Sequence, residues 1–107
     1  SYAPLVQQAT SIMPKTPGCI ATLGLSRSQT AAFAFHGQLT LQTLDEESPC
    51  LWLVADIDTA MQQPDLMQGD IWELRRTIGH PAERKESLWL FERQHPVSKS
   101  VAVEKQD

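Results

Sequence analysis

Long hydrophobic runs and clusters of basic residues are both missing from this sequence. The longest apolar run, over residues 51–55, has the length of a β-strand and falls far short of the ~18–20 residues that cross a bilayer. Acidic residues outnumber basic residues by 13 to 9, and the longest basic cluster is the pair Arg75 and Arg76. Because nucleic-acid binding needs a stripe of positive charge, the sequence predicts neither a membrane span in this chain nor a nucleic-acid partner.

Motifs for metal binding and hydrolytic catalysis are missing as well. The three histidines, His36, His80 and His95, are scattered along the chain and show none of the spacings that bind zinc or copper. No G-x-S-x-G nucleophile elbow surrounds Ser26 or Ser28. The sequence therefore predicts no catalytic residue, no metal site and no cofactor in this chain.

The start of the chain lacks the features of a natural N-terminus. It has no initiator Met, and residues 1–5 contain neither the basic segment nor the apolar segment of a signal peptide. We therefore expect a processed product or an excised piece of a longer protein. Function can then reside in the part that is missing.

What is present is the composition of one ordinary globular domain. Of the 107 residues, 41% are hydrophobic and 21% are charged, as in typical folded proteins. This length suffices for a single core and is too short for two. Because the apolar pattern thins toward the end, residues 1–95 are predicted to form one α/β domain and residues 96–107 a mobile C-terminal tail.

Two segments have the pattern of helices. Apolar residues at helical spacing predict an amphipathic helix over residues 2–13, with Ser1 as its cap. Ser26 stands three residues before Gln29, which is a capping-box arrangement, and it opens an Ala- and Phe-rich helix that ends at a glycine after residues 30–36. The first predicted helix precedes a short apolar run of strand length, and the second follows it.

Five segments have the pattern of strands, and they occupy residues 19–23, 39–44, 50–55, 71–78 and 88–91. The second alternates apolar and polar residues, as an edge strand does, and the third is apolar on both faces, as a central strand is. The last two fit a closing hairpin. Residues 56–69 show no clear period and predict a loop or a short irregular helix.

The order of these elements predicts the fold class. We expect a small layered α/β sheet of about five strands with two helices, in which the first and third strands are parallel and central and the C-terminal hairpin is antiparallel. Within the hairpin, Trp72, Leu74 and Ile78 are expected on one face.

The two cysteines are the most informative pair in the sequence. Cys19 and Cys50 each stand immediately before the apolar run of a strand that is expected to be central. If these strands are parallel neighbours, in a strand order of 2-1-3, the sulfurs come within bonding range, and a disulfide would indicate an oxidising compartment. The alternative is a pair of buried free thiols.

Two loops are candidates for ligand binding, each with a simpler structural explanation. Ser26, Arg27 and Ser28 lie at a predicted helix N-terminus, where free N–H groups favour an anion, although Ser26 is also explained as a helix cap. Asp56 and Asp58 follow the third strand at the end where α/β sheets bind ligands, although Asp is also common in solvated turns.

Three tryptophans fall within predicted strands, where aromatic rings normally pack in a core. Trp89 alternates with Leu88 and Leu90 and therefore faces the other side of the sheet from them. If its ring is exposed, Trp89 is a candidate contact for a sugar or a partner protein.

The order of these segments resembles the soluble C-terminal region of proteobacterial integral-membrane glycosyltransferases related to dolichyl-phosphate-mannose protein mannosyltransferases and aminoarabinose transferases. The resemblance covers residues 1–93, in short motifs. They are SYAPL (1–5), MP (13–14), CIAT (19–22), GL (24–25), SQ (28–29), FAFHG (33–37), CLWLV (50–54), WEL (72–74), GHP (79–81) and LFER (90–93). Phe35 and His36 stand where relatives usually show an aromatic residue before the glycine, which is a small departure.

The resemblance implies an accessory, non-catalytic domain on the periplasmic face of the inner membrane. Its partners would be the transmembrane part of the same chain, which takes a sugar from a polyprenyl-phosphate carrier, and a glycan acceptor. The periplasm is oxidising, in agreement with a disulfide between Cys19 and Cys50. The alternative from another class is a free-standing module that binds a small ligand or a partner protein.

Overall fold

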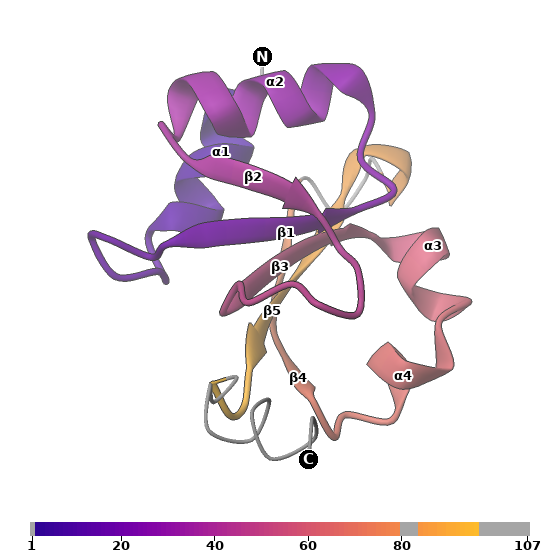
Figure 1. The fold of residues 1–107 in the computed structure, drawn as a ribbon. Coiled ribbons are helices and arrows are strands. Elements are labelled where there is room, and N and C mark those ends of the chain that lie inside the picture. Colours follow the sequence, from indigo (N-terminus) through magenta and orange to yellow (C-terminus); the bar gives the residue numbers. More distant parts are fainter. Residues whose placement is uncertain (1, 80–83, 97–107) are drawn as a thin grey trace.

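The computed structural model describes residues 2–79 and 84–96. In chain order its elements are α1 (Ala3–Thr10), β1 (Cys19–Leu23), α2 (Arg27–His36), β2 (Thr40–Thr43), β3 (Trp52–Asp56), α3 (Ile57–Met61), α4 (Pro64–Met67), β4 (Trp72–Ile78), a 3-10 turn η1 (Arg84–Glu86) and β5 (Leu88–Arg93). The strands form one mixed sheet in the order β2-β1-β3-β5-β4 (Figure 1). The predicted α/β fold is confirmed.

The parallel half of the sheet has the 2-1-3 order that a bond between Cys19 and Cys50 would require. β1 pairs in parallel with β2 on one side and with β3 on the other, with Ile20 opposite Leu41 and Trp52. β2 is an edge strand whose side chains are mostly exposed, whereas residues 52–55 of β3 are all buried. The alternating and continuous apolar patterns therefore distinguished the edge strand from the central one.

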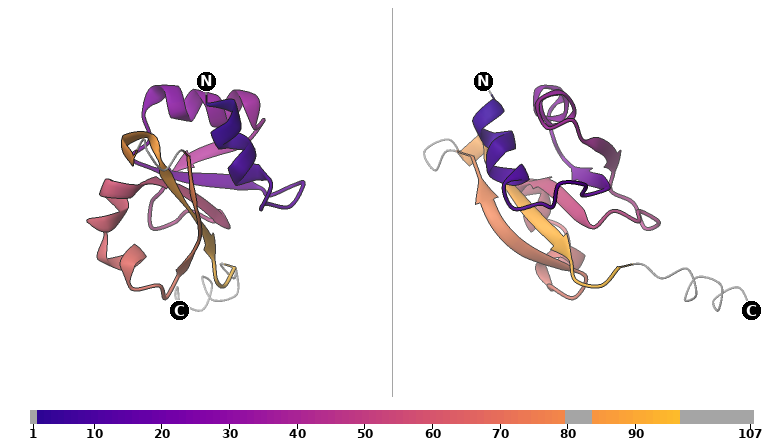
Figure 2. Two further views of the ribbon diagram at one scale, coloured as in Figure 1. Left: turned by 180° about the vertical axis from the view of Figure 1, so that it is seen from behind. Right: turned by 90° about the vertical axis from the view of Figure 1, so that its left-hand side faces the viewer.

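The two faces of the sheet are covered by different helices. On the first face α1 and α2 pack side by side, as both views in Figure 2 show. The buried side chains there are Leu5, Val6, Ala9, Met13, Ile20, Ala32, Phe33, Trp52, Val54, Ile78, Leu88 and Leu90. On the second face the short helices α3 and α4 supply Ala60 and Leu66. The remaining buried side chains of that face are Ala21, Cys50, Leu53, Ala55, Trp72 and Phe91.

Both main helices begin near the predicted residues, but α1 ends early. The capping box at α2 is formed, because Ser26 Oγ accepts a hydrogen bond from Gln29 N–H at 3.1 Å and the Gln29 side chain accepts one from Ser26 N–H at 2.9 Å. α1 ends at Thr10, whose hydroxyl donates to the Val6 carbonyl. Met13, predicted to be helical, instead lies in the following turn and is still buried.

The segment after β3, predicted as a loop or a short irregular helix, forms the two short helices α3 and α4. Asp56 starts α3, because its carboxylate accepts hydrogen bonds from the Thr59 N–H at 3.0 Å and the Thr59 hydroxyl at 2.8 Å. Pro64 lies in the first turn of α4, where a missing N–H costs nothing. Each helix is too short to show a period in the sequence.

The hairpin of β4 and β5 is formed as predicted, but one prediction about its faces is wrong. Trp72 belongs to the core on the second face and Ile78 to the core on the first face. The strand register shifts between Leu74 and Arg76, which marks a β-bulge. An extra residue reverses the alternation of side chains beyond it, so Trp72 and Ile78 lie on opposite faces, and Leu74 is exposed.

Cys19 and Cys50 are joined by a disulfide, with their Cα atoms 5.1 Å apart. The bond ties the start of β1 to the segment that leads into β3, the neighbouring parallel strand. Within the described residues, the helices are too short and too polar to cross a membrane. Ser1, His80 and residues 97–107, which include nearly all of the predicted tail, lie outside the described residues.

Candidate functional site

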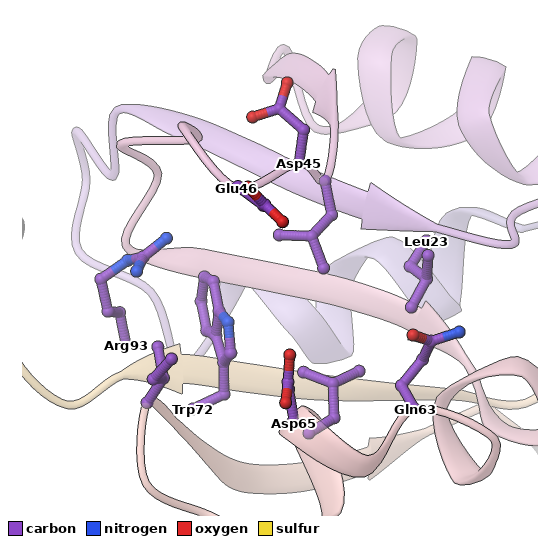
Figure 3. Close-up of a pocket in the computed structure, with 10 residues that line it drawn as sticks. Leu23, Asp45, Glu46, Gln63, Asp65, Trp72 and Arg93 are labelled. Carbon is purple, nitrogen blue, oxygen red and sulfur yellow. The ribbon is translucent and has the colours of Figure 1, made fainter.

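A cavity of about 350 Å³ opens on the second face of the sheet, beside the ends of β1 and β2. Its walls come from four places in the fold: the β1 and β2 ends, the α3–α4 segment, the start of β4 and the end of β5 (Figure 3). The lining residues are Leu23, Leu44, Asp45, Glu46, Gln63, Asp65, Leu66, Ile71, Trp72 and Arg93. The carboxyl ends of parallel strands are where open α/β sheets place their ligands.

The floor of this cavity is apolar. Leu66 of α4 and Trp72 of β4 are buried in the core on the second face, and Leu23 and Leu44 pack against the same core. Ile71, directly before β4, is exposed by 48%. An apolar floor with a few polar groups at its edge is the usual composition of a small-molecule site.

Three carboxylates stand around the opening. Glu46 and Asp65 lie on opposite sides of the cavity, whereas the carboxylate of Asp45 points away from it (Figure 3). Asp45 is occupied within its own loop, because its Oδ1 accepts hydrogen bonds from the Glu47 N–H at 2.8 Å and the Ser48 hydroxyl at 3.3 Å. Glu46 and Asp65 are therefore the carboxylates best placed to meet a ligand.

Arg93 stabilises the wall of the cavity that Trp72 forms. Its Nε donates to the Cys50 carbonyl at 2.9 Å, its terminal NH2 group donates to the Ser48 carbonyl at 2.8 Å, and its Cζ lies 4.4 Å from the centre of the Trp72 ring. Burial lowers the pKa of Arg93 from its ordinary value, but a guanidinium stays charged at any physiological pH. Arg93 therefore links the loop before β3 to β4 and places one positive charge at the cavity wall.

The residues singled out from the sequence lie outside this cavity. Ser26 is the cap of α2 and Asp56 the cap of α3, while Arg27, Ser28 and Asp58 are exposed. None of the five is among its lining residues. A role for these five residues in ligand binding stays a prediction. Ser26 and Asp56 already have a structural role as helix caps.

Two of the cavity residues could have been recognised from the sequence. Asp45 and Glu46 are exposed acidic residues in the loop that follows β2. They also follow an edge strand that runs parallel to β1, so they belong to the same sheet edge as Asp56. Asp65 and Arg93 had no such signal, because only the tertiary fold brings them to that edge.

Trp89 lies on the second face of the sheet, opposite to Leu88 and Leu90, as predicted. Its ring is partly buried and packs edge-on against Phe91, with the ring centres 6.2 Å apart. Its indole N–H donates to the Thr77 hydroxyl at 3.1 Å. A contact between Trp89 and a partner stays a prediction.

Residues that could bind a metal do not gather at this cavity or elsewhere in the described ranges 2–79 and 84–96, where no three side chains of His, Cys, Asp or Glu form a suitable group. His36 is exposed at the end of α2, and His95 is exposed beyond β5. The chemistry that the cavity offers is hydrogen bonding by carboxylates, an amide and a guanidinium above an apolar floor.

The fold and the cavity together define a disulfide-bridged α/β domain with a small, polar-edged cavity at the carboxyl ends of its parallel strands. Comparison with protein-family models, with curated proteins and with solved structures finds no match to this chain.

Proposed function

We propose that this chain is an accessory, non-catalytic domain of a membrane-embedded glycosyltransferase that uses a polyprenyl-phosphate-linked sugar. The resemblance of residues 1–93 to the C-terminal regions of such enzymes supports the proposal. In this arrangement the domain lies on the periplasmic face of the inner membrane and follows a transmembrane part of the same chain.

The disulfide is the observation that carries this proposal. Structural disulfides persist in oxidising compartments and are rare in the cytosol. Cys50 is only 1% exposed and Cys19 packs against the same core, so the bond, which closes an interval of 31 residues, belongs to the core of the fold. A stable bond of this kind fits a domain outside the cytoplasm.

The cavity gives the domain a means of contacting a glycan. Carboxylates, amides and guanidinium groups make paired hydrogen bonds with neighbouring hydroxyls, and an apolar floor packs against the C–H faces of a sugar ring. Glu46, Asp65, Gln63 and Arg93 supply the polar groups. We infer that the cavity positions the sugar acceptor, while the transfer itself takes place in the membrane part.

Topology in intact cells tests the location. The whole gene product, with a tag at its C-terminus, is predicted in the membrane fraction with a mass well above the 12.0 kDa of this chain. Protease added to spheroplasts should remove the tag and leave a cytoplasmic marker intact. A tag that is digested only after lysis, or a soluble product of about this chain's size, would contradict the proposal.

Substitutions in the cavity test the accessory role. With Glu46→Gln and Asp65→Asn together, sugar transfer in membrane vesicles should fall several-fold when the acceptor is limiting and recover when it is saturating, because only acceptor binding is weakened. Asp70→Asn is the matched control, since Asp70 is exposed and does not line the cavity. A loss of rate that persists at saturating acceptor would indicate a catalytic role instead.

The cavity also supports a second candidate, a free-standing module that binds a small ligand. This function requires saturable binding of a sugar or a phosphorylated sugar by the 107-residue chain alone. Calorimetry with a panel of monosaccharides and sugar phosphates distinguishes the candidates when it is combined with the topology result. Binding by a chain that has no membrane part would favour the module.

A further inference from the structure

One wall of the cavity is the segment between β2 and β3, residues 44–51, which contains neither a helix nor a strand. Within this segment only Ser48 and Cys50 are buried. Fixing an irregular segment costs backbone entropy, which burial of apolar side chains usually offsets. The 44–51 segment therefore needs other contacts to keep its shape. Its residues that line the cavity are Leu44, Asp45 and Glu46 (Figure 3).

A local turn gives the first half of the 44–51 segment its shape. The Ser48 N–H donates to the Asp45 carbonyl at 3.3 Å, and the Asp45 N–H donates to the Ser48 hydroxyl oxygen at 3.0 Å. The Leu44 N–H attaches the start of the turn to β1, because it donates to the Thr22 carbonyl at 2.8 Å. These bonds fix the turn internally and at its start, so the position of Glu46 also depends on how the far end is attached.

A disulfide and an arginine attach the far end of the segment to the sheet. The disulfide joins Cys50 to Cys19 at the start of β1. From the end of β5, the Arg93 side chain donates to the Ser48 carbonyl at 2.8 Å and to the Cys50 carbonyl at 2.9 Å. The guanidinium is itself oriented by the Trp72 ring, whose centre lies 4.4 Å from its Cζ. The segment is thus held from the two strands on either side of β3.

We propose that the disulfide and Arg93 position the cavity wall that carries Glu46, and that this wall is ordered only when both contacts are present. Neither cysteine lines the cavity, so the disulfide acts on a ligand through the wall. A wall that is ordered before binding gives higher affinity, because less conformational freedom is lost when the ligand binds. The expected effect on a sugar acceptor rests on the proposed function, whereas the order of the wall does not depend on it.

Oxidation of the two thiols would then complete the cavity. In exchange with a disulfide oxidant, the bond between Cys19 and Cys50 forms and the oxidant's sulfur–sulfur bond breaks. Two electrons and the two thiol protons pass to the oxidant, which becomes a pair of thiols. The pairing of β1 with β3 does not require the disulfide. A chain kept in a reducing compartment therefore has the sheet without the ordered wall.

NMR relaxation of the isotope-labelled 107-residue chain measures the order of the wall. The variants are Cys19→Ala/Cys50→Ala and Arg93→Lys, which keeps the positive charge but not the planar group that reaches both carbonyls. In both, the backbone order parameters of residues 45–48 should fall from about 0.85 to below about 0.6, while those of β1 and β3 stay near about 0.85.

Arg75→Lys is the matched control. Arg75 is also ion-paired, to Glu92, and also lies over a tryptophan ring, that of Trp52, but it does not line the cavity. This variant should leave residues 45–48 ordered. If the cysteine variant loses order in its strands as well, the result is read from Arg93→Lys, which keeps the disulfide. A wall that stays ordered in Arg93→Lys, or that loses order equally in Arg75→Lys, would overturn the positioning role.

Sugar transfer in membrane vesicles tests the effect on the acceptor. In the full-length protein, Cys19→Ala/Cys50→Ala should raise the KM for the acceptor several-fold and leave kcat unchanged, because the wall is disordered and no lining side chain is altered. A disordered wall with an unchanged KM would overturn the acceptor role of the cavity and leave the positioning role standing. The two failures are therefore distinguishable.

Discussion

Gly24 has a backbone conformation and a close neighbour that exclude a side chain. Its φ is +74°, and an added Cβ would lie 2.6 Å from Oγ1 of Thr59, the residue that pairs with the Asp56 cap. We predict that Gly24→Ala lowers the free energy of unfolding by more than the ~1–3 kcal/mol that a strained φ costs alone. Urea denaturation of the purified domain measures the change.

Gly69 provides the control for that prediction. It has the same φ of +74°, but an added Cβ there would meet nothing within 4 Å. Gly69→Ala therefore reports the backbone strain without the clash. If both variants lose the same free energy of unfolding, the clash between the Cβ added at residue 24 and Thr59 contributes nothing, and the prediction is contradicted.

Ser26 is the second residue whose role is measurable by itself. Ser26→Ala removes the acceptor for the Gln29 N–H and should destabilise the domain by about 1 kcal/mol. Ser28→Ala, two residues further on at an exposed position of α2, should change the free energy of unfolding by less than a few tenths of that amount. Equal effects in urea denaturation would contradict the capping role.

At this scale the sequence predicted pairs that are close in the chain, whereas among distant pairs it indicated only the two cysteines. The Ser26 and Gln29 box was visible because its partners are three residues apart. Arg93 was not recognised, because its partners Ser48, Cys50 and Trp72 are more than twenty residues away in the chain. Only the strand order brings such residues together.

The disulfide acts at the scale of elements, since it joins β1 to the segment before β3. Closing an interval of 31 residues should stabilise the domain by roughly 3–4 kcal/mol through the lost entropy of the unfolded chain. We predict that a reductant lowers the urea midpoint correspondingly. In the double variant Cys19→Ala/Cys50→Ala the urea midpoint should already be low, and the reductant should not change it. A change of the midpoint in this variant would show that the reductant does not act through the disulfide.

The elements themselves were largely predictable, with failures at irregular places. β1 was predicted residue for residue, and the edge and central roles of β2 and β3 followed from their patterns. The bulge in β4 was missed, because an exposed edge strand rich in charge shows no alternation that would reveal the extra residue. α1 ends before the predicted residue 13. Ile12 and Met13 pack against the core from the turn that follows the helix, so their apolar pattern does not require a longer helix.

At the scale of the whole molecule, the cavity on the second face of the sheet could not be predicted from the sequence. It is assembled from four separate parts of the fold: the ends of β1 and β2, the α3–α4 segment, the start of β4 and the end of β5. Its apolar lining residues Leu66 and Trp72 belong to the core on that face. The proposed contact with a glycan therefore depends on the tertiary fold as a whole.

The oxidation state of the cysteines in living cells tests the extracytoplasmic placement most directly. Cells that make the full-length protein are quenched in acid, the thiols are blocked with an alkylating reagent with or without prior reduction, and the mass of the peptides containing Cys19 and Cys50 is measured. We predict no label without reduction and one label on each cysteine after it. Labelling of both cysteines without reduction would contradict a periplasmic location and, with it, the proposed role beside a membrane glycosyltransferase.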